Sequence, residues 1–199
     1  MKLLIDFYLR EDVVEIAKDL LGKTLVTNFD GVYTSGVIVE TEAYCGSNDK
    51  ASHANNGKRT PRTEVAFGEG GVAYVYLCYG IHHLFNVVVN ERDKADVVLI
   101  RAIEPREGLE TMALRRNIST EKYQLTAGPG ALTQALGIKT AMTSTSLMGD
   151  YIWIEDTGIA VASKKIKIGT RVGVGYAEED ALKPWRFSIK DNPWVSKAK

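Results

Sequence analysis

Residues 24–44 have the sequence TLVTNFDGVYTSGVIVETEAY, and this stretch decides the fold. Two runs with strand-like composition flank the dipeptide Asp30-Gly31, a strong signal for a two-residue turn between antiparallel strands. Residues 37–44 are therefore predicted to lie in the returning strand of a β-hairpin. Later strand-like runs are joined by links too short for the crossover that a parallel pair requires. The sheet is thus expected to be mostly antiparallel.

Helices and further strands are predicted on both sides of this hairpin. Residues 9–21 carry apolar side chains at helical spacing and end before a glycine, which indicates an amphipathic helix. Pro105 suits the first turn of a helix through residues 108–117, and Pro129 with Gly137 brackets a shorter helix. Further strands are predicted in residues 73–90 with a break near Gly80, and in residues 96–104, 151–156, 164–168, 171–175 and 186–189.

The size and composition of the chain are those of a folded globular protein. A length of 199 residues is typical of one domain, and 45% hydrophobic with 25% charged residues allows a substantial core. No stretch has the composition of a membrane span. We therefore predict a single compact α+β domain over residues 1–199, in which helices flank a mostly antiparallel, twisted β-sheet.

The charges balance overall but not locally. Lys and Arg number 25, as do Asp and Glu, so the net charge gives no sign of a nucleic-acid partner. Residues 50–62 and 163–171 nevertheless each contain four basic residues and no acid. Each segment is either a solvated loop or a contact for an anionic partner.

The numbers and spacing of cysteine and histidine narrow the class of protein further. Cys45 and Cys78 are too few for a disulfide framework, and the chain reaches Asp6 before the apolar region of a signal peptide could form. A cytoplasmic protein is expected. The three histidines occur without the spacing of a zinc site, so we expect no metal.

Two carboxylates lie in the returning strand of the hairpin. By alternation, Glu40, Glu42 and Tyr44 share one face with Ile38, while Val37, Val39, Thr41 and Ala43 form the apolar face. Composition alone favours the solvated side of an edge strand. The alternative is a site that activates water or pairs with arginine. Arg101 interrupts an apolar strand, so it should be buried with a partner such as Glu40 or Glu42.

Aromatic and glycine-rich segments offer two further candidates. Tyr74 and Tyr76 share a strand face, and Tyr79 precedes Gly80, where a turn can push its side chain outward. These tyrosines either pack in the core or grip an unstacked base. Residues 125–138, LTAGPGALTQALGI, present backbone N–H groups suited to a phosphate, although such a helix start is also common by itself.

Several motifs resemble, in order, those of the alkyladenine DNA glycosylases, also called 3-methyladenine DNA glycosylases. The matching segments are VETEAY (39–44), His53 followed by KRTPR (58–62), YVYLCYG (74–80), Asn86, VLIRAIEP (98–105), AGPGAL (127–132), RVGVG (171–175), KPWRF (183–187) and NPWVS (192–196). The resemblance runs from about Tyr8 to Ser196. Each motif is short, but their shared order makes the resemblance specific.

The resemblance implies both a fold and a reaction. The fold would be similar to the C-terminal domain of formyltransferases, with a protruding β-hairpin that enters the DNA minor groove. The activity would be base-excision repair by a monofunctional glycosylase, which flips a damaged purine from double-stranded DNA and leaves an abasic site. Its substrates would belong to the class of 3-methyladenine, 7-methylguanine, hypoxanthine and ethenoadenine. We expect a monomer without cofactor or membrane association, in the cytoplasm and at the nucleoid if the source is bacterial.

The resemblance also assigns roles to individual residues. Glu42 would be the general base, and Arg101 with the backbone of Val172 would hold the attacking water. Tyr44 would form one wall of the base pocket, and His53 and Tyr76 the other. Asn86 would discourage normal guanine, and Tyr79 would fill the gap left in the base stack. Contacts to the DNA backbone are predicted for Lys58, Arg59, Arg62, Gly128, Gly130 and Lys165.

Some positions receive other assignments. Glu40 is expected to be a structural partner of a basic side chain, because two ionised carboxylates so close would raise each other's pKa. Ala131 stands where the family often has a lysine, which removes one expected phosphate contact. His82 and His83 replace apolar residues, and they would either touch the minor groove or cap the hairpin.

Two other function classes fit the same sequence. A non-catalytic module that binds damaged DNA would keep the pocket and Tyr79 but lack a competent water site. A hydrolase of free nucleosides would keep the aromatic pocket but have no duplex partner. Glu42 together with Arg101 argues against the first, and dependence of binding on Tyr79 and on salt would argue against the second.

Overall fold

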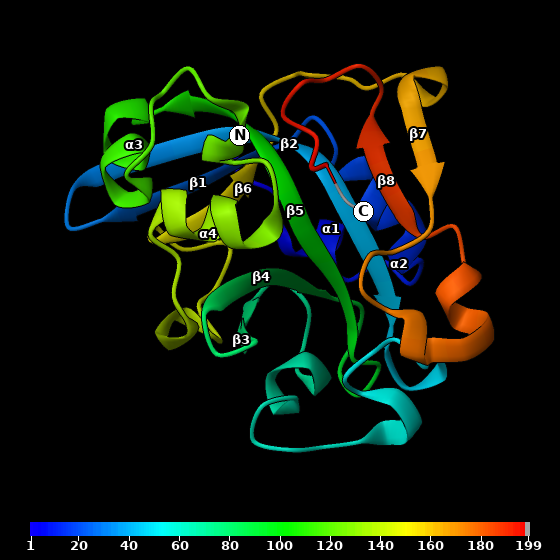
Figure 1. Ribbon diagram of the computed structural model, residues 1–199. Coiled ribbons are helices and arrows are strands. Elements are labelled where there is room, and N and C mark those ends of the chain that lie inside the picture. Colours follow the sequence, from blue (N-terminus) through cyan, green and yellow to red (C-terminus); the bar gives the residue numbers. More distant parts are fainter. Residues whose placement is uncertain (198–199) are drawn as a thin grey trace.

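An antiparallel sheet of eight strands dominates the computed structural model, which describes residues 1–197 (Figure 1). The strands run in the order β3-β4-β5-β2-β1-β6, and β8 pairs with both β2 and β7. Their bounds are β1 Thr24–Phe29, β2 Val32–Cys45, β3 Ala73–Cys78, β4 His82–Val89, β5 Asp96–Glu107, β6 Ile152–Glu155, β7 Ile166–Gly169 and β8 Arg186–Ile189. The α-helices are α1 Ile5–Tyr8, α2 Val13–Asp19, α3 Leu109–Arg116 and α4 Pro129–Leu136. The predicted α+β class is confirmed.

The hairpin of β1 and β2 forms as the Asp30-Gly31 signal predicts. The two strands pair from Phe29↔Val32 to Thr24↔Val37. Asp30 and Gly31 both have positive φ, 55° and 79°, which a tight hairpin turn of the primed type requires.

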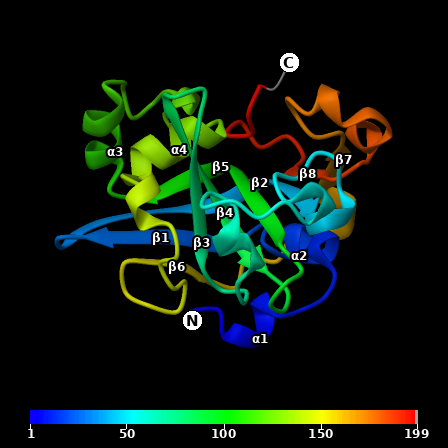
Figure 2. The same cartoon turned by 90° about the horizontal axis from the view of Figure 1, so that it is seen from below.

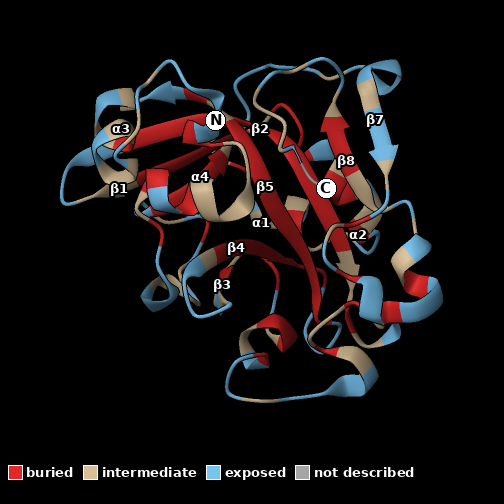
Figure 3. Ribbon diagram, in the orientation of Figure 1, coloured by how far each residue is buried: buried red, intermediate tan, exposed pale blue. Residues whose placement is uncertain are grey.

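Strand β2 lies inside the sheet rather than at its edge. It pairs with β5 on one side and, in succession, with β1 and β8 on the other. Figure 3 shows both β2 and β5 buried along most of their length. The solvated edge strand that composition alone favoured for Glu40 and Glu42 is therefore wrong, because pairing partners distant in sequence cover both sides.

A bulge in β2 changes which side chains share a face. Its pairing with β5 shifts register between Ile38 and Thr41. Ile38 consequently joins Ala43 in the main hydrophobic core, although simple alternation placed it with the two glutamates. The bulge turns Glu40 and Glu42 away from that core.

Helices cover both sides of the central strands. Asp12 caps α2, since its carboxylate accepts hydrogen bonds from the N–H groups of Val14 and Glu15. Helix α2 packs on β2 and β5, and α4 packs on β4 and β5. Figure 2 shows α3 and α4 on one side of the β2–β5 layer and α1 and α2 on the other. Helix α4 begins at Pro129 and ends before Gly137, as predicted.

Three predicted elements differ from the structure. The first helix, predicted over residues 9–21, covers only Val13–Asp19 and follows the separate short helix α1. Pro105 lies in β5, where it is opposite Gly36 next to a register shift, and the helix begins only at Leu109. Proline is tolerated at such irregular positions, so β5 continues until Gly108, whose φ of 75° ends the strand. Residues 171–175 form a loop, not a strand, because β7 already occupies the free edge of β8 and Gly173 has a φ of 75°.

The β3–β4 hairpin extends beyond the sheet. Strand β4 pairs with β5 only from Asn86 to Val89, so the turn end of the hairpin is free of β5. Tyr79 and Gly80 form the turn, with φ of 50° and 73°.

Among residues 1–197, every helix is too short or too polar to span a membrane.

Candidate active site

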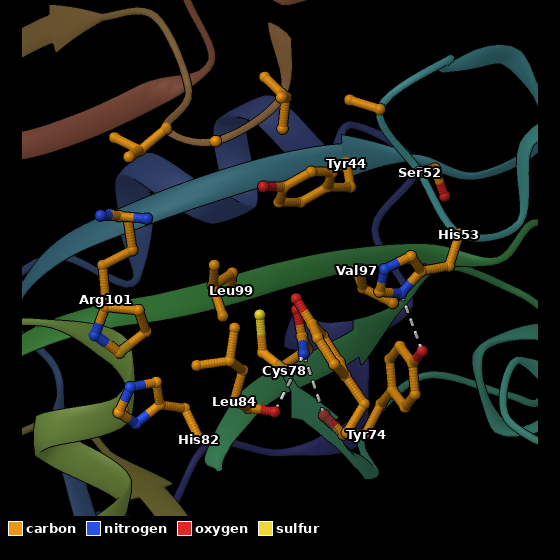
Figure 4. Close-up of a pocket in the computed structure, with 18 of the residues that line it drawn as sticks. Tyr44, Ser52, His53, Tyr74, Cys78, His82, Leu84, Val97, Leu99 and Arg101 are labelled. Atoms are coloured by element: carbon orange, nitrogen blue, oxygen red, sulfur yellow. Dashed lines mark hydrogen bonds between the residues drawn. The ribbon is translucent and has the colours of Figure 1, made fainter. Parts of the chain in front are cut away.

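A cavity of about 690 Å³ lies between the β3–β4 hairpin and the central strands (Figure 4). The end of β2 contributes Tyr44, β5 contributes Leu99 and Arg101, and the segment between β2 and β3 contributes His53. The start of α4 and the loop around Val172 complete the wall. The structure therefore brings together most of the residues predicted for the water site and the base pocket.

Glu42 is fully buried directly behind this cavity. Its Oε1 accepts a hydrogen bond from the Val172 amide at 2.8 Å and lies 3.2 Å from Arg101 Nη1. Its Oε2 accepts a hydrogen bond from the Tyr44 hydroxyl at 2.8 Å. These three partners line the cavity, whereas Glu42 itself does not. A carboxylate has about four acceptor positions, so one remains on Oε2.

The environment of Glu42 makes its carboxylate a better proton acceptor than an exposed glutamate. Burial raises the pKa of the Glu42 carboxyl above its ordinary value, and the Arg101 charge lowers it again in part. The hydrogen bonds from Tyr44 and Val172 act in the same direction as Arg101. Burial also raises the pKa of Tyr44 well above the usual range, so its hydroxyl stays protonated and donates.

Glu40 is a separate, fully buried carboxylate with three donors. It accepts hydrogen bonds from Arg101 Nε at 3.0 Å, from Arg186 Nη1 at 3.3 Å and from the Ser196 amide at 2.9 Å. Glu40 is thus a structural partner of basic side chains, as predicted. Arg101 lies between the two glutamates and pairs with both, which confirms its predicted burial with a carboxylate.

Aromatic rings form the side of the cavity opposite Tyr44. The His53 and Tyr76 rings are 4.7 Å apart, edge to face, and Tyr74 lies 5.5 Å from Tyr76. His53 Nδ1 lies 3.1 Å from the Tyr74 hydroxyl (Figure 4). Burial, followed by the charges of Arg62 and Lys58, lowers the pKa of His53 to about 4. His53 is therefore a neutral ring at neutral pH.

Asn86 lies deep in the cavity with little freedom to rotate. Its Nδ2 donates to the carbonyl oxygens of Tyr74 at 3.1 Å and Leu84 at 3.4 Å. The Asn86 side chain is thereby fixed against strand β3.

Tyr79 lies at the hairpin tip and is 89% exposed, in agreement with the outward position predicted for it.

The predicted DNA-backbone residues occupy different environments. Arg59 pairs with Glu64 and Asp93, so its charge is neutralised locally. Lys58 and Lys165 are exposed outside the cavity, whereas Arg62 lines it and stacks 4.6 Å above the Tyr76 ring. Gly128 and Gly130 also line the cavity.

The positions that depart from the family pattern meet near α4. A Cβ on Gly130 would lie 2.9 Å from His82 Nδ1, so the close approach of His82 requires glycine there. Ala131 and His82 line the cavity, while His83 Nδ1 accepts a hydrogen bond from the Thr140 amide at 3.2 Å. His83 therefore links the hairpin to the segment after α4.

A buried ion pair beneath Tyr44 has no counterpart among the patterns of the sequence. Arg171 and Asp49 are fully buried and paired, and Arg171 also donates to the carbonyl oxygens of Ala43 and Asp180, both at 3.0 Å. Its guanidinium lies 4.7 Å from the Tyr44 ring centroid. The sequence places Arg171 in a basic segment that is either solvated or in contact with an anionic partner, and only its contact with Asp49, distant in sequence, distinguishes it. The pair holds the neighbouring Val172 amide against Glu42.

Within the described residues, no cluster of three or more His, Cys, Asp and Glu side chains could hold a metal ion. Beside the aromatic cavity lies a carboxylate held by a guanidinium, a hydroxyl and an amide.

Comparison with known proteins gives a consistent result. The family described as "Methylpurine-DNA glycosylase (MPG)" matches residues 6–193. Relatives named "Putative 3-methyladenine DNA glycosylase" include one from Natranaerobius thermophilus, 48% identical over 98% of this chain and 99% of its own, and one from Clostridium botulinum, 49% identical over 96% and 97%. One from Bacillus cereus is 47% identical over 94% of this chain and 95% of its own. Because the match includes every segment that lines the cavity, the chain belongs to the methylpurine-DNA glycosylase family.

Proposed function

We propose that this protein removes damaged purines from duplex DNA by hydrolysis of the N-glycosidic bond, using a water activated by Glu42. The observation that carries the proposal is the placement of Glu42, whose partners Tyr44, Arg101 and Val172 all line one aromatic cavity. The substrates proposed are alkylated or deaminated purines of the 3-methyladenine, 7-methylguanine, hypoxanthine and ethenoadenine class. Residues 1–199 would act as one domain and as a monomer in the cytoplasm.

The proposed reaction needs one proton acceptor. A water that donates to the free position on Glu42 Oε2 attacks C1′ of the flipped nucleotide, and the bond from C1′ to the base nitrogen breaks as the base leaves with the electron pair. A cationic purine leaves as a neutral base, whereas a neutral purine leaves as an anion that takes up a proton from solvent. Glu42 takes the proton of the water, and its negative charge supports the oxocarbenium character of the sugar. The Val172 N–H already donates to Glu42, so its carbonyl oxygen is the backbone group proposed to contact the water.

The cavity walls suit a flat base. Tyr44 is proposed to contact one face of the extruded purine, and His53 with Tyr76 the other. Asn86, whose Nδ2 is held by two backbone carbonyls, is proposed to clash with the exocyclic amino group of normal guanine. The exposed Tyr79 would occupy the gap left in the duplex, and Gly128 and Gly130 would offer N–H groups to phosphates nearby.

The direct test is an excision assay on four duplexes, each with one lesion of the proposed class. Purified protein is expected to release the free base and to leave an abasic site that breaks only after alkali treatment, because no amine nucleophile is needed. The corresponding free deoxynucleosides, assayed in parallel, should remain intact. Hydrolysis of nucleosides without duplex excision would favour the nucleoside hydrolase. Tight lesion binding without release of base would favour the binding module.

The pH dependence of excision should identify the base. Glu42 must be ionised to accept a proton, and its pKa is raised, so single-turnover excision should fall as pH decreases through a value above about 4.3, the ordinary glutamate pKa. The pKa of His53 is lowered to about 4, so His53 adds no step between about pH 5 and 8. His53→Gln should therefore slow excision without moving the acid limb of the pH profile. A limb that disappears in this variant would assign the titration to His53 instead.

A further inference from the structure

The charged groups that line the cavity are all cationic. Arg62 and Arg101 contribute guanidinium groups, and among residues 1–197 no aspartate or glutamate side chain lines the wall. The positive charge of Arg101 is neutralised by its ion pairs with Glu40 and Glu42 behind it. Arg62 forms no ion pair with the described residues, so its positive charge faces the cavity without compensation.

Arg62 already occupies the site on Tyr76 that would attract a cation. Its guanidinium carbon lies 4.6 Å from the Tyr76 ring centroid, within the range of a cation–π contact. Its Nη2 lies 3.1 Å from His53 Nε2 and 3.4 Å from His53 Nδ1. The flat cation therefore contacts both rings proposed to hold the same face of the base.

Two classes of damaged purine would meet this guanidinium differently. A purine methylated on a ring nitrogen, such as 7-methylguanine in DNA, carries a positive charge, so it is repelled by Arg62 and competes with it for Tyr76. A neutral lesion such as hypoxanthine has no such charge, and its ring nitrogens and carbonyl oxygen can accept hydrogen bonds from Arg62. Arg62 is an exposed residue, so solvent screens part of its charge, and the discrimination relies mainly on its hydrogen-bond donors and on its place over the Tyr76 ring.

We propose that Arg62 is a specificity-determining residue that favours neutral damaged purines over permanently cationic ones. The inference rests on the proposed function, because it concerns which lesions the same cavity accepts. It differs from a role as a DNA-backbone contact, since a phosphate contact would support all lesions equally. The stack on Tyr76 and the contact with His53 favour the specificity role.

The test compares two otherwise identical duplexes that contain hypoxanthine or 7-methylguanine, under single-turnover conditions. Arg62→Gln should lower the ratio of the hypoxanthine rate to the 7-methylguanine rate by about two- to fivefold, as the loss of one exposed cation contact would. Arg59→Gln is the matched control, because Arg59 lies in the same loop but outside the cavity, where its charge pairs with Glu64 and Asp93. It should leave the ratio unchanged.

Further measurements separate the alternatives. Arg62→Lys keeps the charge but loses the flat stack on Tyr76, and it covers a failure of Arg62→Gln to fold, so it should lower the ratio by less than Arg62→Gln does. An unchanged ratio in folded Arg62→Gln, or an equal loss on both duplexes with a weaker salt dependence, would overturn the specificity role. Failure of the wild type to release either base would instead overturn the proposed function itself.

Discussion

Glu42→Gln is expected to reduce single-turnover excision by about 10³-fold, as the loss of a general base does. Glutamine keeps the size of the side chain and can still accept hydrogen bonds from Val172, Tyr44 or Arg101, so the cavity should keep its shape. It cannot accept a proton from water at neutral pH. The variant should therefore bind a duplex with one hypoxanthine as tightly as the wild type, measured by fluorescence anisotropy, while rapid-quench assays show the loss of excision.

The stability of Glu42→Gln should change less than its activity. Because the pKa of Glu42 is raised in the folded protein, its ionised form is disfavoured there, and folding stability decreases as pH rises from the unfolded pKa through the folded one. A neutral side chain removes this cost at pH 7 but also removes one of the two carboxylates that pair with Arg101. The temperature of thermal unfolding should therefore fall less than in Glu40→Gln, which removes a carboxylate partner of both Arg101 and Arg186. Unchanged excision in this variant would show that the base is another group.

Local patterns predict those parts of the fold that local geometry controls. The Asp30-Gly31 turn, the limits of α4 at Pro129 and Gly137, and the exposed Tyr79 next to Gly80 each depend on residues adjacent in sequence. The burial of Arg101 with a glutamate was predictable because an uncompensated guanidinium within an apolar strand is too costly.

Features set by distant strands were not predictable in the same way. Alternation cannot distinguish an interior strand from an edge strand, and β2 becomes interior only through pairing with β5 and β8. The bulge that moves Ile38 into the core also arises from that pairing. The Arg171–Asp49 pair joins residues 122 positions apart, so the basic segment that contains Arg171 shows no sign of the buried partner.

Glu40→Gln is expected to lower the free energy of unfolding by about 3 kcal/mol, because it removes a buried carboxylate that two arginines share. Arg101 would retain only Glu42 as a carboxylate partner, and Arg186 would lose the carboxylate with which it pairs. The Ser196 amide would also face a side chain with fewer acceptor positions, which weakens the hold on the C-terminal segment.

The two glutamate variants should therefore show opposite behaviour. Folded Glu40→Gln should keep single-turnover excision within about tenfold of the wild type, since Arg101 still contacts Glu42 and the base itself is intact. Denaturant unfolding measures the stability loss, and excision is assayed below the unfolding transition so that only folded molecules are compared. Glu40→Asp is the matched control, because it keeps the charge and should recover part of the stability. If folded Glu40→Gln lost as much excision as Glu42→Gln, the assignment of base and structural partner would be reversed.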